Sequence, residues 1–321
     1  MGRETGTLSV VIPVLNEEAV LDELLRRLAG ALDAVPGLAW RAVFVDDGST
    51  DRTAEILLSR GEKDPRIGLL RLSRNFGHQP AISAGLAHAD ADAVVILDAD
   101  LQDPPEVIPD LVTAWRNGAD VVVARRRSRK ERGLRRLGFA LFHRFFGLLS
   151  DFPVAANAGV FGLLDRAAAE ELRRLTERNR FLPGLRSWVG FRQAVVQYDR
   201  EERAEGAPKQ TFRRLARYAM DGIFSFSYKP LRLLMGAGIV VSLIGFGTAS
   251  FFIGKRLLGY EQAFTGFTTL VSLVLFLGGL QLIALGLLGG YLGRIYDEVK
   301  ARPLYIVKSR HGLAGSDRPP A

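Results

Sequence analysis

Asp98 and Asp100 form an acidic pair of the kind that holds a divalent metal ion. They follow Ala93–Leu97, a short apolar run that predicts a strand buried on both faces, and two prolines shortly afterwards prevent the strand from continuing. Because successive side chains of an extended chain alternate sides, both carboxylates should point the same way. Such oxygen ligands suit Mg²⁺ or Mn²⁺, ions that usually also bind substrate phosphates, and Gln102 could add a neutral oxygen.

A bare D-x-D pattern is common in loop caps and at solvated surfaces, so its setting decides its interpretation. In the first half of the chain, apolar strand-like runs alternate with segments of helical spacing. Strands are expected at 8–14, 40–45, 67–72, 92–97 and 120–124, and helices at 17–32, 53–59, 79–88 and 105–117. This alternation predicts an α/β domain, a mostly parallel sheet with helices on both faces, and such sheets bind ligands at the carboxyl edge.

The polar residues after the first two predicted strands also have local interpretations. Asn16 is a good N-cap for a helix that begins at the next residue, and Gly48 permits a tight turn. Asp46 and Asp47 fit the same turn chemistry, which explains either of them as well as a ligand-binding role does.

Three motifs occur in a fixed order: VDDGSTDRT at 45–53, RNFGHQPAISAGL at 74–86 and DADLQDPPE at 98–106. Together they resemble the family-2 glycosyltransferases, specifically the polyprenyl-phosphate glycosyltransferases, the group of dolichyl-phosphate mannose synthase and bacterial undecaprenyl-phosphate sugar transferases. The resemblance extends from about Leu8 to Val307. It implies a GT-A (Rossmann-like) fold and inverting, metal-dependent transfer of a sugar from a UDP- or GDP-linked donor to an undecaprenyl- or dolichyl-type polyprenyl phosphate.

The resemblance also implies roles for individual residues. The metal ligands would be Asp98, Asp100 and Gln102. The donor nucleotide and phosphates would be bound by Pro13, Asn16, Glu17, Asp46, Asp47 and Asp98. The lipid phosphate would be held by Arg125 and Arg136, since guanidinium groups pair well with phosphate oxygens. Nine basic residues between 125 and 144 compete for the second of these roles.

An R-x-x-G-x-x-K element further along the chain resembles a family loop that closes over the donor diphosphate. Its basic residues are Arg203 and Lys209. A basic surface loop is the alternative interpretation. The predicted catalytic residues are therefore Asp100, Arg125, Arg203 and Lys209.

The chain departs from the family at one informative place. Many bacterial relatives have N-x-G-D-F-R, with the acidic residue proposed as a general base, whereas this chain has Val160 and Gly162 in place of the acid and the arginine. A positioned base contributes about 10²–10⁴ in rate. However, a phosphate monoester has a second pKa near 6, so most acceptor molecules are already dianionic at pH 7. We therefore retain the enzyme interpretation and expect an altered wall of the sugar pocket.

Two basic segments have apolar residues at helical spacing and predict helices in the membrane interface. The first covers about 131–149, and the second 211–230. A solvated basic face and a nucleic-acid surface are the alternatives. The basic positions carry no interleaved stacking aromatics, which argues against a nucleic-acid partner.

Two long segments predict transmembrane helices at about 233–254 and 267–292. Residues 233–254 include 22 residues without a charge and 262–293 include 32, and about 20 apolar residues cross the bilayer core. Basic residues flank the pair at its outer ends and are few in the connection, which predicts cytoplasmic termini at the inner membrane. Gly286, Gly289, Gly290 and Gly293 allow close helix contact, so we expect a homo-oligomer, for which a tetramer is one option.

The expected organisation is a cytoplasmic GT-A domain at 1–210, an interfacial helix at 211–230, a transmembrane pair at 231–294 and a cytoplasmic C-terminal tail at 295–321. The chain has no cysteine, which excludes disulfides and thiolate metal sites, and its formal net charge of +8 favours an anionic partner. Two alternatives to the polyprenyl-phosphate enzyme are a family-2 enzyme with another lipid acceptor and a membrane-anchored protein that binds nucleotide sugar without transferring it.

Overall fold

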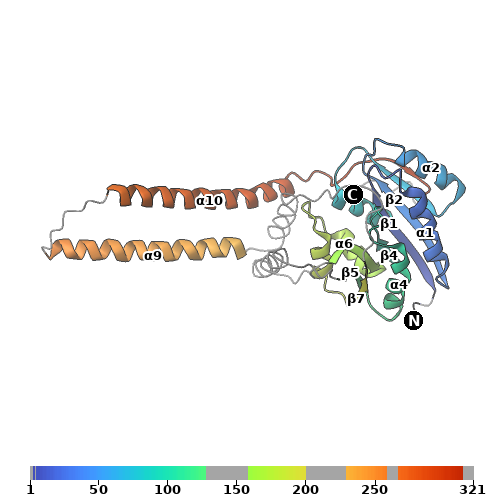
Figure 1. Cartoon of the computed structure of the whole chain (residues 1–321), viewed down its shortest axis with the longest axis horizontal. Helices are drawn as coiled ribbons and strands as arrows, with labels where there is room; N and C mark the ends of the chain where they lie inside the picture. Colours follow the sequence, from blue (N-terminus) through green and yellow to red (C-terminus); the bar gives the residue numbers. More distant parts are fainter. Residues whose placement is uncertain (1–2, 4, 128–157, 200–228, 259–266, 314–321) are drawn as a thin grey trace.

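The computed structural model describes residues 3, 5–127, 158–199, 229–258 and 267–313. Figure 1 shows an α/β domain from which two long helices, α9 and α10, extend. Within the described residues, eight strands form one sheet in the order β7-β5-β6-β4-β1-β2-β3-β8. The predicted interfacial helices at about 131–149 and 211–230 lie outside the described residues.

The first half of the sheet follows the predicted alternation of strands and helices. Its elements are β1 (Gly6–Val14), α1 (Leu21–Asp33), β2 (Leu38–Asp46), α2 (Thr53–Lys63), β3 (Ile67–Leu72), α3 (His78–His88) and β4 (Ala93–Ile96). The four strands pair in parallel, with β1 between β2 and β4 and with β3 beyond β2. Each strand is followed by a helix that packs on the sheet, so the polar residues after β1, β2 and β4 all meet at the carboxyl edge.

The second half of the sheet is mixed in direction. A 3₁₀ turn (Pro105–Val107) leads into α4 (Ile108–Arg116), and β5 (Val121–Arg126), β6 (Ala158–Asp165), α6 (Arg166–Arg174), α7 (Leu182–Trp188) and β7 (Gln193–Tyr198) follow. Strand β6 runs antiparallel to both β4 and β5, whereas β5 and β7 are parallel. The resulting α/β architecture confirms the predicted fold class.

Alternate side chains of the strands enter two apolar layers on opposite faces of the sheet. Val10 and Ile12 of β1 join α1, α2 and α4 on one face, whereas Val11 joins α3, α6 and α7 on the other. Helix α1 shows why its sequence forms this layer, because Leu21, Leu24, Leu28 and Leu32 recur at helical spacing and are fully buried. A strand that is apolar on both sides needs cover on both sides, which the helices provide.

Two local expectations were wrong. Helix α1 begins at Leu21 rather than at Glu17, and its N-cap position is Val20, without a side-chain cap. Asn16 instead has a positive φ of 55° and its Oδ1 accepts a hydrogen bond from Thr50 N at 2.8 Å. A side-chain oxygen can accept a hydrogen bond from the backbone of a neighbouring loop as readily as from its own helix, and the local sequence does not reveal which donor it meets.

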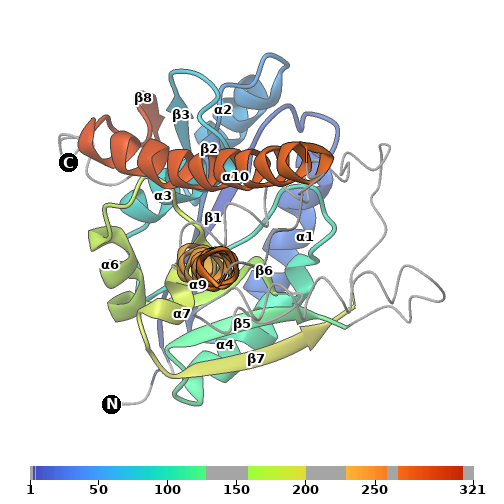
Figure 2. The ribbon, with the colours of Figure 1, turned by 90° about the vertical axis from the view of Figure 1, so that its left-hand side faces the viewer.

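Helices α9 (Lys229–Leu257) and α10 (Phe267–Val299) contain the two predicted membrane segments. The spans Leu231–Thr248 and Phe276–Val299 are long and apolar enough to cross a membrane, and neither is buried by the rest of the protein. Helix α9 starts near the α/β domain and α10 returns to it, although Figure 2 shows α9 nearly end-on while α10 runs across the view. Apart from the backbone of α10 itself, a Cβ built at Gly286, Gly289 or Gly293 meets no atom within 4 Å, so these glycines make no close helix contact among the described residues.

The segment after α10 contributes a strand that the sequence did not reveal. Strand β8 (Val307–His311) adds to the sheet antiparallel to β3, and Ser73 N donates to Ile306 O at 2.8 Å beside it. The side chain of Leu313 leaves no room for a Cβ at Gly68 of β3. The predicted C-terminal tail is therefore attached to the α/β domain at the far edge of its sheet.

Candidate active site at the carboxyl edge of the sheet

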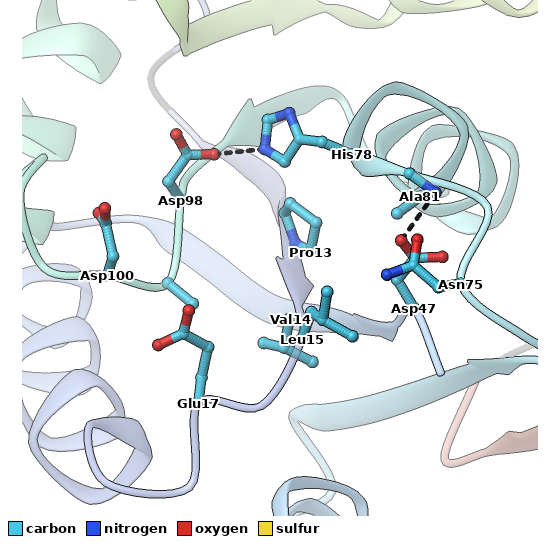
Figure 3. A pocket seen from close by; sticks show the side chains of 12 residues that line it. Pro13, Val14, Leu15, Glu17, Asp47, Asn75, His78, Ala81, Asp98 and Asp100 are labelled. Carbon is cyan, nitrogen blue, oxygen red and sulfur yellow. Dashed lines mark hydrogen bonds and ion pairs between the residues drawn. The ribbon is translucent and has the colours of Figure 1, made fainter. Parts of the chain in front are cut away.

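A cavity of about 310 Å³ opens at the carboxyl edge of β1, β2 and β4, beside the N-terminus of α3. Its polar lining consists of Glu17, Asp47, Asn75, His78, Asp98 and Asp100, and its other lining residues are Pro13, Val14, Leu15, Gly77, Ala81 and Ala99. Figure 3 shows Asp98 and Asp100 on one side of this cavity and Asp47 and Asn75 on the other. The cavity lies where the strand order reverses around β1, which is where open α/β sheets bind ligands.

The acidic pair reaches the cavity from a turn rather than from a strand. Both carboxylates line the same cavity, but β4 ends at Ile96. The alternation of side chains along a strand, which we expected to align Asp98 and Asp100, is therefore not the cause. The turn is held partly by Gln102 N, which donates to Asp100 Oδ1 at 3.2 Å, and it contains Leu101 at a φ of 57°. A left-handed conformation is costly for a leucine, so the surrounding structure must impose it.

His78 joins the acidic pair from the first turn of α3. Its Nε2 lies 2.8 Å from Asp98 Oδ1. Burial lowers the pKa of His78, but the hydrogen bond to Asp98 and the nearby carboxylates outweigh it, so the net pKa lies above its ordinary value. This places a cationic imidazole beside the acidic pair over a wider pH range than an isolated histidine would allow.

Asp47 fixes the turn that precedes α3 while facing the cavity. Its carboxylate accepts hydrogen bonds from Phe76 N at 2.7 Å and from Gly77 N at 2.9 Å. Burial raises the pKa of Asp47 above its ordinary value, although these two N–H donors favour the charged form. The predicted tight turn at Gly48 has a φ of 79°, and a Cβ there would come within 2.7 Å of the backbone of Arg74 and Asn75.

Asp46 has a different position from its neighbour. It is fully buried, accepts a hydrogen bond from Ser49 N at 2.8 Å and pairs with Arg71 Nε at 3.2 Å. It does not line the cavity. The structure therefore separates the two aspartates of the D-D-G-S-T motif into one that supports the turn and one that faces the cavity.

The other predicted site residues fall into three groups. Pro13 and Glu17 line the cavity, as do Asp47, Asp98 and Asp100. Asn16, Gln102 and Arg125 are described but do not line it; Arg125 lies near the end of β5. Arg136, Arg203 and Lys209 lie outside the described residues.

Val160 and Gly162, which replace the family's acid and arginine, lie on β6 and do not line the cavity. The pairing of β6 with β5 shifts register between Val123 and Arg125. The buried Arg186 of α7 lies against this irregular stretch, and its Nη2 donates to Gly159 O at 3.1 Å. A Cβ at Gly162 would clash with Val122 O and lie 3.0 Å from Arg186 Nη1, so the glycine leaves room for an arginine from another element.

Sequence reasoning missed two polar residues of the cavity, Asn75 and His78. Both stand in the motif at 74–86 and follow β3, which ends at Leu72. The signal was available, because polar residues after a parallel strand gather at the same edge as those after its neighbours.

The acidic pair fits a Mg²⁺ or Mn²⁺ ion that also binds donor phosphates. Asp98 and Asp100 both line the cavity, and hard divalent ions are commonly held by one or two carboxylates together with substrate phosphates. Within the described part of the chain, no group of three or more histidine or acidic side chains is placed to hold an ion alone. These two carboxylates therefore suit a divalent ion whose remaining ligands come from a phosphorylated molecule.

Comparison with known proteins identifies the class. The glycosyl transferase family 2 profile matches residues 9–173. The chain is 44% identical to an uncharacterized glycosyltransferase of Synechocystis sp. over 96% of this chain and 97% of the relative. It is 41% identical to the SfII prophage-derived bactoprenol glucosyl transferase of Shigella flexneri, over 95% of this chain and 98% of the relative. The chain belongs to glycosyltransferase family 2 and is a glycosyltransferase.

Similar solved structures are more distant in sequence. The mannosyltransferase PcManGT from Pyrobaculum calidifontis, solved in complex with GDP-Man and Mn²⁺, is 16% identical and matches 89% of each chain with a TM-score of 0.45. TarS of S. aureus is 17% identical in its 1–349 form and matches 60% of this chain and 59% of that chain, with a TM-score of 0.40.

Proposed function

We propose that this protein transfers a sugar from a nucleoside diphosphate sugar to a polyprenyl phosphate at the cytoplasmic face of the membrane. The observation that carries the proposal is an acidic cavity at the carboxyl edge of the sheet, in a chain with two exposed apolar helices. Relatives named bactoprenol glucosyl transferase match almost their whole length at 39–41% identity, so the likeness includes the helices as well as the α/β domain.

The donor would occupy the cavity with its nucleoside toward Asp47 and its diphosphate toward the acidic pair. Asp98 and Asp100 would hold the divalent ion, with Gln102 supporting the loop through its hydrogen bond to Asp100. When bound, the ion neutralises charge that develops on the departing nucleoside diphosphate. His78 would help to orient the carboxylate of Asp98 through the hydrogen bond between them.

The acceptor phosphate supplies its own nucleophile. A phosphate oxygen would bond to the anomeric carbon while the bond from that carbon to the diphosphate oxygen breaks, with the electron pair leaving on the nucleoside diphosphate. A single displacement of this kind inverts the anomeric configuration. A phosphate dianion carries no proton to remove, which accords with Val160 at the position of the family's acidic residue. Arg125, Arg136, Arg203 and Lys209 are the candidates to bind the acceptor and donor phosphates.

The helices α9 and α10 would place the cavity at the cytoplasmic face. Lys229 and Arg232 lie at the domain end of α9, and Arg294 and Lys300 lie at or just beyond the domain end of α10. Basic residues beside a membrane span favour the cytoplasmic side. Helix α10 has 33 residues, and at about 1.5 Å per residue it exceeds the roughly 30 Å of the bilayer core.

The test is transfer by the purified full-length protein. It would be incubated with undecaprenyl phosphate, Mn²⁺ or Mg²⁺ and a panel of radiolabelled UDP- and GDP-sugars. We expect labelled lipid from one donor, and none without the divalent ion. Donor binding without labelled lipid would refute the proposal in favour of a protein that binds nucleotide sugar only, and transfer to diacylglycerol alone would assign another acceptor.

A further inference from the structure

A buried polar cluster lies beside the acidic loop and outside the cavity. Its members are Asp103, Tyr198 and Arg126. The Tyr198 hydroxyl donates to Asp103 Oδ1 at 2.5 Å, Arg126 Nε donates to the Tyr198 oxygen at 3.0 Å, and Arg126 Nη2 lies 3.1 Å from Asp103 Oδ2. Asp103 is 1% exposed and Tyr198 is 5% exposed, so the hydrogen bond between them is shielded from water, whereas Arg126 is partly exposed.

The three side chains come from segments that are far apart in the sequence. Arg126 and Tyr198 end β5 and β7 and are direct partners in the parallel pairing of these strands. Asp103 ends the loop that begins with Asp98, and the ring of Tyr198 packs edge-on against Phe161 of β6 at 5.6 Å between centroids. The cluster therefore ties the acidic loop to three strands of the sheet.

The charges of the cluster are arranged so that each member stabilises the others. Burial alone lowers the pKa of Arg126, but the charge of Asp103 and the Tyr198 hydroxyl raise it, with the net result well above its ordinary value. Burial and the neighbouring Asp103 raise the pKa of Tyr198, so its hydroxyl stays protonated and acts as a donor. A buried carboxylate that lost either partner would be left poorly compensated, which makes the position of Asp103 strongly specified.

The loop itself requires such an anchor. Leu101 has a left-handed backbone conformation, and this conformation persists only where the surrounding contacts impose it. Gln102 lies between two restrained neighbours: Leu101 is buried, and Asp103 is buried and bonded to Tyr198 and Arg126. The backbone between the end of β4 and Asp103 therefore has little conformational freedom. This restriction also limits the positions of the Asp98 and Asp100 carboxylates, which face the cavity.

We propose that Asp103, Tyr198 and Arg126 are positioning residues that hold the acidic loop so that Asp98 and Asp100 bind the divalent ion together. This inference rests on the proposed function, because it assumes that the acidic pair is the metal site. None of the three side chains lines the cavity, so they act through the loop rather than on the donor.

The experiment measures Mn²⁺ binding directly, by the loss of the free Mn²⁺ signal in electron paramagnetic resonance. Full-length wild type and Tyr198→Phe would be titrated with Mn²⁺ in the presence of UDP and, separately, GDP. Tyr198→Phe keeps the ring and its contact with Phe161 but removes the hydroxyl that joins Asp103 to Arg126. We expect Mn²⁺ affinity to fall about tenfold, the lower end of what outer partners of metal ligands contribute.

Two further variants control for stability. Tyr305→Phe removes the hydroxyl of another tyrosine that packs against the apolar layer, near β8 at the opposite edge of the sheet, and it should leave Mn²⁺ affinity unchanged. Arg126→Lys keeps a cation for Asp103 but lacks the planar group that also reaches Tyr198, so it should show an intermediate loss. Melting temperatures of all variants would be recorded without metal.

The outcomes separate this inference from the proposed function. Mn²⁺ affinity within about twofold of wild type in Tyr198→Phe would overturn the inference, as would an equal loss in Tyr305→Phe or no Mn²⁺ binding by wild type. If wild type binds Mn²⁺ and Tyr198→Phe weakens it, but wild type transfers no sugar, the inference stands and the proposed function fails. Normal transfer with normal Mn²⁺ affinity in Tyr198→Phe would refute only the inference.

Discussion

The α/β domain and the pair α9–α10 use apolar side chains in opposite ways. Leu57 of α2 is fully buried in the domain, whereas Leu243 of α9 is 66% exposed, and other large apolar residues of α9 and α10 are exposed similarly. The hydrophobic effect disfavours such exposure to water by about 25 cal/mol per Å². The domain supplies its own apolar surroundings, whereas the two spans of the helix pair are not buried against other described residues. The proposed bilayer would supply apolar surroundings for them.

The largest expected effect is the loss of sugar transfer in Asp100→Ala, with membrane insertion of the protein unchanged. Asp100→Ala should lower sugar transfer by more than about 100-fold, because loss of a metal ligand should exceed the 10–100-fold typical of an outer partner. The measurement is labelled lipid formed per unit of protein, beside the fraction of protein in the membrane. Asp110→Ala, on the exposed side of α4, is the matched control and should be fully active. Substantial activity in Asp100→Ala would exclude the metal assignment.

A second variant would weaken the domain and leave the helix pair intact. Leu28 of α1 is fully buried, so Leu28→Ala should destabilise the protein by about 2–5 kcal/mol through lost burial and the cavity left behind. The measurement is thermal unfolding in detergent, with the fraction of membrane-inserted protein as a second readout. A large loss of insertion in Leu28→Ala would show that the two regions are not independent.

The converse variant would weaken the helix pair. Val240 lies in the middle of the span Leu231–Thr248, and Val240→Arg should cost about 2.5–3.5 kcal/mol on insertion. Because the chain has no cysteine, a single Leu258→Cys after α9 gives a clean report on orientation. A membrane-impermeant maleimide added outside cells should label this cysteine, and less so when Val240→Arg is also present. Labelling only after cell lysis would contradict the proposed orientation.

Arg125 allows a finer comparison, between the acidic cavity and the basic end of β5. Arg125→Ala should raise the KM for polyprenyl phosphate about tenfold, as loss of a hydrogen bond to a charged group predicts, while donor affinity stays near that of wild type. Steady-state kinetics with each substrate varied in turn would measure both. Equal losses for donor and acceptor would move Arg125 to the donor side.

The smallest expected effect concerns pH and the α/β domain alone. Hydrogen bonds from Thr7 N and Oγ1 lower the pKa of Asp92, with a further contribution from Arg166. This carboxylate therefore contributes stability above its unfolded-state pKa of about 3.9, and the contribution is lost as pH falls through the lower folded-state pKa. Asp92 is nearly half exposed, so Asp92→Asn should cost about 1 kcal/mol or less at pH 7.

The control for this prediction is the same pair of proteins in acid. The difference in melting temperature between wild type and Asp92→Asn should shrink toward zero as the pH drops below about 3.9. Helix α9 contains no acidic residue, so its insertion should not change over the same range. A difference that grew in acid would show that Asp92 is not held in its charged form.

The sequence by itself determined the order of strands and helices. It also distinguished the α/β domain, which buries its own apolar residues, from the two long apolar segments. Strand alternation with helices, the two long apolar segments and the acidic pair after β4 are local properties, because each depends on the period or spacing of neighbouring residues. These properties were sufficient to predict the α/β fold, the two long helices and the acidic pair of the cavity, whereas Glu17 and the ligand-binding role of Asp47 were predicted from the family resemblance. The family motifs added the class of enzyme.

Only the tertiary structure decided what depends on distant residues. Asp46 and Asp47 are adjacent and chemically identical, yet their contacts differ. Asp46 is buried against Arg71 of β3 and accepts a hydrogen bond from Ser49 N. Asp47 accepts hydrogen bonds from the backbone before α3 and faces the cavity. Likewise, β8 joins β3 and Asp103 meets Tyr198 across 95 residues. Spacing along the chain carries no information about these contacts, because they form only when separate elements pack on the same sheet.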